Sequence, residues 1–411
     1  MNAEIIAVGS EMLTAQRIDT NSLYLTGELN DLGIEVVRKC VIGDHRERLA
    51  AAIRRSLSSS EILIVSGGLG PTEDDVTREA VALALNRRLV FHADVFAALE
   101  QRFARGHRKM AEVNKRQAFI IEGADVLANE RGTAPGQWVE ESGSVTILLP
   151  GPPHELQAIF ERQCRSRLSR IAPKQVIRTL LLRVAGMSES DLDQLISPVY
   201  TKYENPATTI LAAAGDIQVH LRAHCVTEAE AEALLAEVAG TIELLLGDRI
   251  YSRNGDPIEA VVGDLLRRLG ATVSVAESCT GGMLGEHFTS VAGSSDYFLG
   301  GFVTYTDVMK VELLGVSPEI LEHHGAVSRE TAELMALGAR RRTNSTYAIS
   351  ITGNAGPSGD AAPVGAIYIG LADAAGVHVA HRQFQGDRAR VRALTVQTAL
   401  DLLRRRLTGH L

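Results

Sequence analysis

The stretch VAESCTGGM, residues 275–283, decides the fold of the last third of the chain. The apolar run Thr272–Ala276 before it is typical of a buried strand, and Met283–Thr289 is typical of a helix. Gly281 and Gly282 supply the tight junction, because glycine adopts backbone conformations that other residues avoid. The pattern therefore predicts a strand, a turn that carries Ser278, and a helix, which is a building unit of an α/β domain.

Ser278 is a candidate nucleophile. Backbone N–H groups at a helix start are free to donate, so an oxyanion or a phosphate could bind beside it. The candidate base is Lys310, in the first turn of a helix that Thr306 or Asp307 caps after a strand over Gly301–Tyr305. A desolvated lysine has a lowered pKa and can take a serine proton. A solvated lysine and a close-packed turn without chemistry remain the alternatives.

The composition limits the class of protein. A chain of 411 residues with 45% hydrophobic content predicts two or three domains of a soluble globular protein. The net charge of −8 argues against a broad nucleic-acid-binding surface, so a nucleic-acid partner is not expected. The four cysteines have no metal-ligand or redox spacing, which predicts four free thiols. Without a leader or a membrane-length apolar span, we expect a cytoplasmic protein.

The first third of the chain alternates strand and helix signals, as a parallel α/β sheet does. Such folds bind ligands at the carboxyl ends of their strands. The predicted elements are a strand over Glu4–Val8, a helix over Asn21–Leu32, a strand over Ile34–Val41, a helix over Arg46–Leu57 and a strand over Ile62–Ser66.

Two loops of this part carry candidate chemistry, residues 9–13 and residues 66–75. The glycines of the second loop let the backbone approach a phosphate, and Thr72 can cap a helix over Val76–Leu85. The three acids Glu73–Asp75 would repel a bare phosphate, so a divalent cation that bridges carboxylates and a diphosphate would reconcile them. The alternative is that these acids only complement a helix dipole.

The rest of the chain changes character twice. Residues 172–250 predict a small α+β unit, with strands over Val176–Val184 and Ile217–Val226, a helix opened by Ser188, and a long helix over Glu228–Leu246. From Pro257 onward a second α/β layer follows. Its further elements are helices over Ile258–Leu269, Ser328–Arg341 and Asp387–Leu407 and strands over Tyr347–Ile351, Gly365–Asp373 and Val377–Phe384.

Several ordered motifs of this last part resemble the C-terminal domain of the CinA (competence/damage-inducible) family. They are residues 276–282, 292–295, 301–305, Lys310, 325–328, 351–353 and 386–388. The resemblance implies that the domain deamidates nicotinamide mononucleotide without a cofactor. It implies Ser278 as nucleophile, Lys310 as base and Tyr305 as a supporting residue. The substrate-binding residues that it implies are Thr280, Gly281, Gly282, Thr352, Gly353 and Arg388.

The N-terminal motifs resemble the molybdopterin-binding fold as it occurs in the same family. They are residues 9–11, 19–22, 67–72, 74–75 and 149–155. The resemblance implies a metal-dependent ADP-ribose pyrophosphatase with a divalent cation on Glu11, Asp74 and Asp75. The site residues that it implies are Glu11, Asn21, Gly68, Thr72, Asp74 and Asp75.

The expected architecture is therefore two three-layer α/β domains, molybdopterin-binding-like and deamidase, joined by a small α+β KH-like domain. The molybdopterin-binding-like domain would cover residues 1–171, the KH-like domain residues 172–251 and the deamidase domain residues 252–411. The family also implies a homodimer. The middle domain lacks an evident Gly-x-x-Gly loop, so it gives no nucleic-acid signature.

One stretch departs from the family. Residues 354–365 (NAGPSGDAAPVG) are shorter than the glycine-rich stretch that the family usually carries, and they lack its lysine. We expect the shorter segment to change the affinity for the substrate or the identity of the substrate. The functional alternative is a pterin-binding or competence-related adaptor without catalysis.

Overall fold

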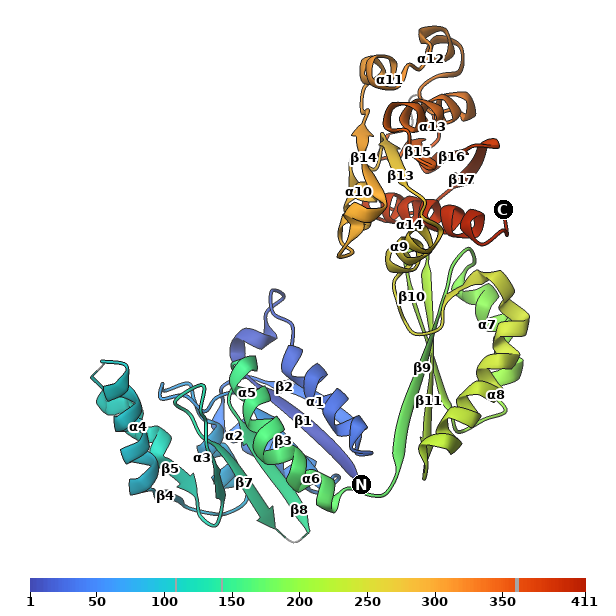
Figure 1. Ribbon diagram of the computed structural model, residues 1–411. Helices are drawn as coiled ribbons and strands as arrows, with labels where there is room; N and C mark the ends of the chain where they lie inside the picture. The colour runs from blue at the N-terminus through green and yellow to red at the C-terminus, as the bar shows by residue number, and fades with distance from the viewer. Residues whose placement is uncertain (108, 142, 359–361) are drawn as a thin grey trace. The chain divides into compact units, whose positions relative to one another are not determined.

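The computed structural model describes residues 1–107, 109–141, 143–358 and 362–411. The chain divides into two compact units. The first contains Met1–Arg178 and His224–Glu232, and the second contains Thr179–Ala223 and Ala233–Leu411. Figure 1 shows the elements of both in chain order.

A six-stranded sheet in the order β2-β1-β3-β8-β7-β6 forms the centre of the N-terminal unit. Its first four strands are parallel, and β7 and β6 join antiparallel. The strand β3 is buried along its whole length because helices cover both faces of the sheet. The apolar sides of α1, α5 and α6 pack on one face, and those of α2 and α3 pack on the other. This is the predicted three-layer α/β arrangement.

The elements of this unit are β1 (Asn2–Val8), η1 (Ser10–Leu13), α1 (Thr20–Asp31), β2 (Glu35–Ile42), α2 (Arg46–Leu57), β3 (Ile62–Ser66), α3 (Thr77–Ala84), β4 (Leu89–Phe91), α4 (Ala93–Arg105), η2 (Glu112–Ala118), β5 (Phe119–Ile121), β6 (Asp125–Leu127), β7 (Gly136–Glu141), β8 (Ser144–Leu149), α5 (Pro153–Ile159), η3 (Phe160–Cys164) and α6 (Arg165–Ile171). The segment η3 is one turn of π-helix between α5 and α6.

The prediction that Thr72 caps α3 is wrong. The helix begins at Thr77, and its N-cap residue Val76 makes no side-chain cap. Asp75 instead accepts hydrogen bonds from the backbone N–H (2.9 Å) and the hydroxyl (2.6 Å) of Thr72. This local ring closes a turn before the helix, which starts at Thr77, one residue later than predicted.

The middle part of the chain forms a four-stranded sheet in the order β10-β11-β9-β12, in which β10 pairs antiparallel with β11 and β12 pairs antiparallel with β9. The helices α7 and α8 lie on one side of this sheet (Figure 1). The predicted capping by Ser188 is confirmed, because its side chain accepts from the Asp191 N–H. The elements are β9 (Val176–Val184), α7 (Glu189–Tyr200), β10 (Ala207–Ala213), β11 (Asp216–Cys225), α8 (Glu228–Leu246), η4 (Gly247–Arg249) and β12 (Ile250–Ser252).

A buried ion pair stabilises the second unit. The Asp216 carboxylate accepts from the Arg183 guanidinium and from the Tyr251 hydroxyl, the latter at 2.6 Å. Burial alone would raise the pKa of Asp216, but the hydrogen bonds from Arg183 and Tyr251 outweigh it and lower that pKa. Removing the carboxylate would leave a guanidinium and a hydroxyl buried without this partner.

We therefore expect Asp216→Ala to lower the free energy of unfolding by about 3 kcal/mol. Urea denaturation of the full chain, followed by circular dichroism, measures this loss. The matched control is Asp264→Ala, which removes a solvent-exposed pair with Arg267 and is expected to cost under about 0.5 kcal/mol. Equal losses in both variants would contradict the assigned role of the buried pair.

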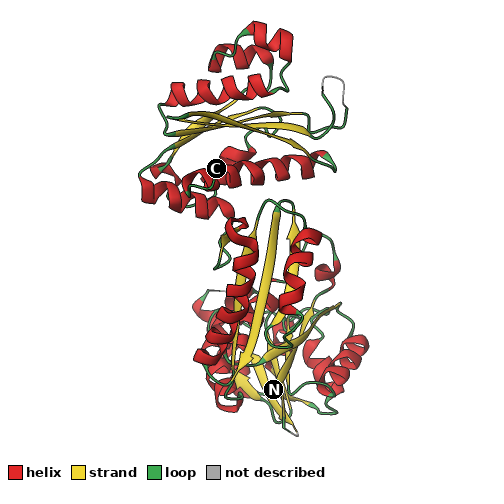
Figure 2. Cartoon of the chain, turned by 90° about the vertical axis from the view of Figure 1, so that its right-hand side faces the viewer, coloured by secondary structure: helices red, strands yellow, loops and turns green. Residues whose placement is uncertain are grey.

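The C-terminal part is a five-stranded sheet in the order β14-β13-β15-β16-β17, with helices on both faces (Figure 2). The strands β14, β13 and β15 are parallel, and β16 and β17 are antiparallel. One core joins the sheet to α9, α10 and α14, and a second core joins its other face to α11 and α13. The second predicted three-layer domain is thereby confirmed.

The elements of this part are α9 (Ile258–Leu269), β13 (Val273–Glu277), α10 (Met283–Thr289), η5 (Ser294–Asp296), β14 (Phe298–Val303), α11 (Asp307–Leu314), α12 (Pro318–His324), α13 (Arg329–Thr343), β15 (Tyr347–Gly353), β16 (Ala366–Asp373), β17 (Gly376–Gln383) and α14 (Arg388–Leu407).

The strand β14 lies earlier in the chain than predicted. It ends at Val303. The Thr304 N–H makes one more bond to the Glu277 carbonyl (2.8 Å), and the chain then leaves the sheet because Thr306 caps α11 through the Met309 N–H. Tyr305 therefore belongs to the turn and not to the strand. All four cysteines are free, as predicted. Within the described residues, no helix is both long and apolar enough to cross a membrane.

Candidate active site

The turn between β13 and α10 presents Ser278 at the end of a buried strand. The Ser278 N–H donates to the Ile351 carbonyl of β15 (3.0 Å), and the Gly281 N–H donates back to the Ser278 carbonyl (3.1 Å). Gly281 and Gly282 have φ values of 60° and 96°, a region that favours glycine. The predicted role of both glycines as the junction is confirmed. The Ser278 residue is only 9% exposed.

The N-terminus of α10 is closed by a carboxylate. Glu277, 1% exposed, accepts from the backbone N–H groups of Gly282 (3.1 Å), Leu284 (3.0 Å) and Gly285 (2.8 Å). The expectation that the helix start is free to bind an anion is therefore wrong for these amides. A carboxylate at this position satisfies the unpaired donors and complements the helix dipole.

Donors for an oxyanion must therefore come from the turn itself. Within the described part of the chain, the N–H groups of Cys279 and Thr280 donate to no backbone or side-chain oxygen. The Thr280 hydroxyl is fully buried and has no partner in the same part of the chain. Arg392, on α14, donates to the Thr280 carbonyl at 2.6 Å and so holds this turn from the other side.

Lys310 lies beside Ser278. Its Nζ atom is 3.5 Å from the Ser278 Oγ atom, 3.1 Å from the Thr304 carbonyl oxygen and 3.5 Å from the Asp307 Oδ1 atom. The residue is 1% exposed. Burial lowers the pKa of Lys310, although the nearby Asp307 carboxylate opposes this shift. The structure thus places a desolvated amine against the candidate nucleophile.

Tyr305 and Arg388 contact each other at the rim of the turn. The Arg388 Nη2 atom donates to the Tyr305 hydroxyl (3.1 Å), and its Nη1 atom donates to the Gly356 carbonyl (2.7 Å). Tyr305 is 60% exposed. Among the described residues, neither side chain forms a hydrogen bond with Ser278 or Lys310. Arg388 instead links the turn after β14 to the segment that begins at Asn354.

Thr352 and Gly353, at the end of β15, serve the packing of the sheet. The Thr352 hydroxyl donates to the Ala326 carbonyl at 2.5 Å, so only its lone pairs stay available to a ligand. A Cβ atom on Gly353 would lie 2.7 Å from the Ala366 carbonyl, so close strand packing requires glycine. The carbonyl next to them, that of Ile351, is the one that holds Ser278.

The departing segment 354–365 is organised by its first residue. The Asn354 side-chain amide donates to the carbonyls of Ser358 and Ala362, both at 2.7 Å, and its oxygen accepts from the Gly356 N–H at 2.8 Å. Residues 359–361 lie outside the described residues. Asn354 thus shapes the backbone to which Arg388 binds.

In the N-terminal unit, Gly68 and Asn21 lie at the carboxyl end of the central strands. Gly68 has a φ of 64°, and a Cβ atom there would lie 2.4 Å from the Thr77 hydroxyl. The Asn21 amide donates to the Gly151 carbonyl (2.7 Å) and the Ser66 hydroxyl (3.3 Å). Its buried Oδ1 atom has no partner in the described residues. The Asn21 contacts join the start of α1 to the end of β3 and to the loop after β8.

The acids predicted to bind a metal do not form a ready site. Glu11 lies over Gly9, where a Cβ atom would meet its carboxylate at 2.6 Å, and Asp75 closes the turn with Thr72. Among the described residues, no three or more His, Cys, Asp or Glu side chains are grouped so that they could hold a metal ion. Asp74 is exposed and joins no such group. As arranged, these residues do not fit a divalent cation, and its binding stays a prediction.

Two arginines that the sequence did not indicate hold the loop before α3. Arg78, 1% exposed, donates to the carbonyls of Leu69 and Gly70 (2.5 and 2.9 Å), and burial lowers its pKa. Arg116 donates to the Thr72 carbonyl (2.9 Å). Arginine fixes a loop in this way when its fork of donors meets several carbonyls. A buried arginine in a short helix gives little signal in a sequence pattern.

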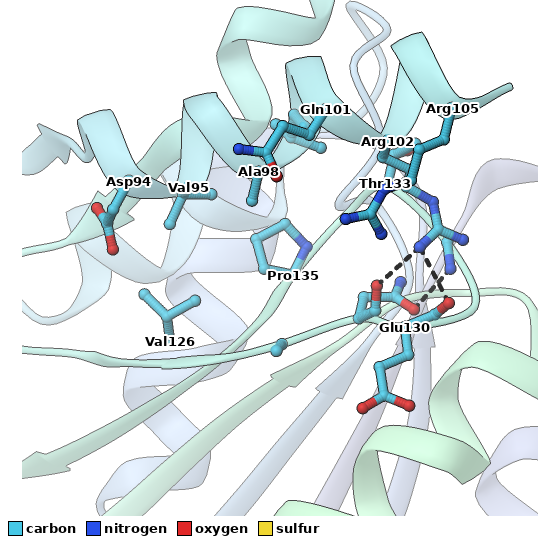
Figure 3. A pocket seen from close by; sticks show the side chains of 14 residues that line it. Asp94, Val95, Ala98, Gln101, Arg102, Arg105, Val126, Glu130, Thr133 and Pro135 are labelled. Atoms are coloured by element: carbon cyan, nitrogen blue, oxygen red, sulfur yellow. Dashed lines mark hydrogen bonds between the residues drawn. The ribbon is translucent and has the colours of Figure 1, made fainter. Parts of the chain in front are cut away.

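A cavity of about 520 Å³ lies between α4 and residues 126–135 (Figure 3). Val95 and Pro135 belong to its apolar wall, and Arg102 donates there to the Glu130 carbonyl (2.9 Å). None of the predicted pyrophosphatase residues lines this cavity. It is therefore separate from the loops described above.

Three family models match the chain in sequence order. Residues 4–170 match the probable molybdopterin binding domain, residues 179–252 match the damage-inducible protein CinA KH domain, and residues 255–407 match the CinA C-terminal domain. Among solved structures, the competence/damage inducible protein CihA from Agrobacterium tumefaciens is 41% identical, covering 37% of this chain and 93% of that chain with a TM-score of 0.36.

Relatives of the same length extend over the whole chain. A CinA-like protein of Solibacter usitatus is 72% identical over 411 residues, covering 100% of this chain and 99% of the relative. A CinA-like protein of Koribacter versatilis is 47% identical, with 99% and 100% covered. With three matching domains and full-length relatives of this similarity, the chain belongs to the CinA family.

Proposed function

We propose that the C-terminal part of the chain hydrolyses the carboxamide of nicotinamide mononucleotide to a carboxylate and ammonia. The observation that carries the proposal is the buried contact between the Lys310 Nζ atom and the Ser278 Oγ atom at 3.5 Å. A serine needs a base to become a nucleophile, and a desolvated lysine is one of the few side chains that can serve at neutral pH.

The first half of the reaction forms an acyl-enzyme. The Ser278 oxygen attacks the amide carbon while its proton passes to Lys310, and a tetrahedral oxyanion forms. The N–H groups of Cys279 and Thr280, which donate to no other backbone group among the described residues, would stabilise that oxyanion. The carbon–nitrogen bond then breaks, and Lys310 returns the proton to the nitrogen, so ammonia leaves.

The second half restores the enzyme. Water attacks the acyl carbon, and Lys310 takes one proton from it. The carbon–oxygen bond to Ser278 breaks, the Ser278 oxygen takes the proton back, and the nicotinate nucleotide leaves as a carboxylate. Lys310 relays one proton in each half-reaction, and the remaining proton of the carboxylic acid product passes to the released ammonia or to water. The Lys310 side chain that makes these two transfers is 1% exposed.

Arg388 is the group best suited to the substrate phosphate. Its guanidinium matches phosphate geometry, and it lies at the rim with the exposed Tyr305. Substrate binding would require Arg388 to exchange its Gly356 carbonyl for phosphate oxygens. The phosphate-free compound nicotinamide is then a poor substrate.

The test is to incubate the full chain with nicotinamide mononucleotide and to measure ammonia and the acid product. Expected is one ammonia for each nicotinate mononucleotide formed, with little product from nicotinamide itself. Absence of ammonia at every pH from 6 to 10 would contradict the proposal. An intact nucleotide that binds without turnover would favour the adaptor alternative.

A second activity, ADP-ribose diphosphate hydrolysis, is proposed for the N-terminal unit. The buried, unpartnered Asn21 Oδ1 atom favours a ligand that donates a hydrogen bond there, because buried polar atoms in native proteins normally have a partner. The diphosphate would lie along the Gly67–Gly70 backbone. AMP formation measured with and without a chelator tests both the activity and the predicted cation. Equal AMP formation with the chelator would contradict the cation.

A further inference from the structure

We propose that Asp307 sets the lower pH limit of the C-terminal activity by competing with Ser278 for the protons of Lys310. The inference deepens the proposed deamidase function and rests on it. Asp307 is the first residue of α11 and lies one helical turn before Lys310. Its side chain is 60% exposed, whereas that of Lys310 is 1% exposed.

The contacts of Lys310 match an ammonium group. Three acceptors surround the Nζ atom: the Ser278 hydroxyl, the Thr304 carbonyl and the Asp307 carboxylate. An ammonium has three N–H donors, while a neutral amine has two and one lone pair. Deprotonation therefore frees one position, and the Ser278 hydroxyl can then donate to the lone pair. The same three acceptors can therefore surround both the protonated Lys310 of the resting state and the neutral Lys310 of the catalytic state.

Asp307 is the charged member of this set. Burial lowers the pKa of Lys310, and the attraction of Asp307 acts in the opposite direction. Of the described residues, only one other titratable group acts on Lys310, the Cys279 thiol on the nucleophile turn. Burial raises the pKa of Cys279 to about 11, so this thiol is neutral in the working range. The balance between amine and ammonium therefore depends on Asp307.

The test uses Asp307→Asn, which keeps an acceptor oxygen and a residue suited to a helix start while it removes the charge. We expect the acid limb of the pH–rate profile to move to lower pH by about half a unit to one unit. At a pH on that limb the rate would rise about three- to tenfold, while the plateau at high pH would stay within about twofold. The control is Glu312→Gln, an exposed acid of the same helix that does not act on Lys310.

A second measurement, inactivation by a fluorophosphonate, tests the role of Asp307 without depending on which substrate the protein uses. A fluorophosphonate forms a bond between the Ser278 oxygen and phosphorus, fluoride leaves, and Lys310 takes the proton. The pH dependence of this inactivation should show the same shift in Asp307→Asn, even if nicotinamide mononucleotide is not the substrate. An unshifted limb, or a lowered plateau without a shift, would overturn the role of Asp307. Failure to label Ser278 in the unmodified chain at any pH would overturn it as well.

Discussion

Replacing Ser278 by alanine is expected to lower ammonia release by about 10³-fold or more, because the proposed reaction would then have no nucleophile to form the acyl-enzyme. This is the largest effect that we expect of any single substitution in the chain. Removing one hydroxyl from a turn that backbone hydrogen bonds hold should leave the fold intact. The measurement is the initial rate of ammonia release, together with circular dichroism of the purified variant.

The matched control for Ser278→Ala is Cys279→Ala. Cys279 follows directly in the same turn and is also a potential nucleophile, but burial raises its pKa to about 11 and leaves little thiolate. We expect Cys279→Ala to keep the rate within about threefold of the unmodified chain, since only a buried thiol is lost. An inactive Cys279→Ala beside an active Ser278→Ala would assign the chemistry to the thiol and refute the serine mechanism.

Replacing Lys310 by alanine is expected to lower the rate by about 10²- to 10⁴-fold, the range that a positioned general base contributes. Lys310→Arg should be nearly as inactive, because a guanidinium stays protonated and cannot take the serine proton. The pair of variants separates a base from a fixed positive charge. An active Lys310→Arg would show that only the charge matters and would contradict the mechanism.

Two further measurements address Lys310. Because burial lowers its pKa, the neutral amine becomes available at a lower pH than in free lysine, so the rate should rise with pH through that pKa and then level off. A small primary amine such as methylamine, added to Lys310→Ala, should restore part of the rate by occupying the space of the buried side chain. Rescue that follows the amount of neutral methylamine would identify the base directly.

The local sequence pattern predicted the turn that carries Ser278, between β13 and α10, well. A buried apolar run before two glycines gives both the strand and the junction, and the helix over Met283–Thr289 was predicted with its observed bounds. The contact between Ser278 and Lys310 also follows from topology, since β13 and β14 are parallel neighbours whose carboxyl ends lie together. Periodicity predicted the two strands, whereas their position as neighbours in the sheet is seen only in the structure.

Side-chain partners that are distant in sequence could not be predicted in this way. Arg392 lies more than a hundred residues from the Thr280 carbonyl that it holds, and nothing in the local pattern of α14 indicates the contact. The capping of α10 by Glu277 was missed for another reason: a glutamate at the end of a buried strand gives no sign of where its carboxylate turns. Glu11, Asp74 and Asp75 come from two separate motifs, and among the described residues they do not belong to a group of three or more side chains that could hold a metal ion.

The closure of α10 by Glu277 has a consequence for inhibitor design. Compounds that mimic a tetrahedral adduct, such as boronic acids, gain much of their affinity in many hydrolases from an open helix end. Here that end is already occupied by the Glu277 carboxylate. The anionic adduct of an inhibitor with Ser278 would have to bind the Cys279 and Thr280 amides instead. Compact electrophiles should therefore bind to this serine more tightly than bulky anions.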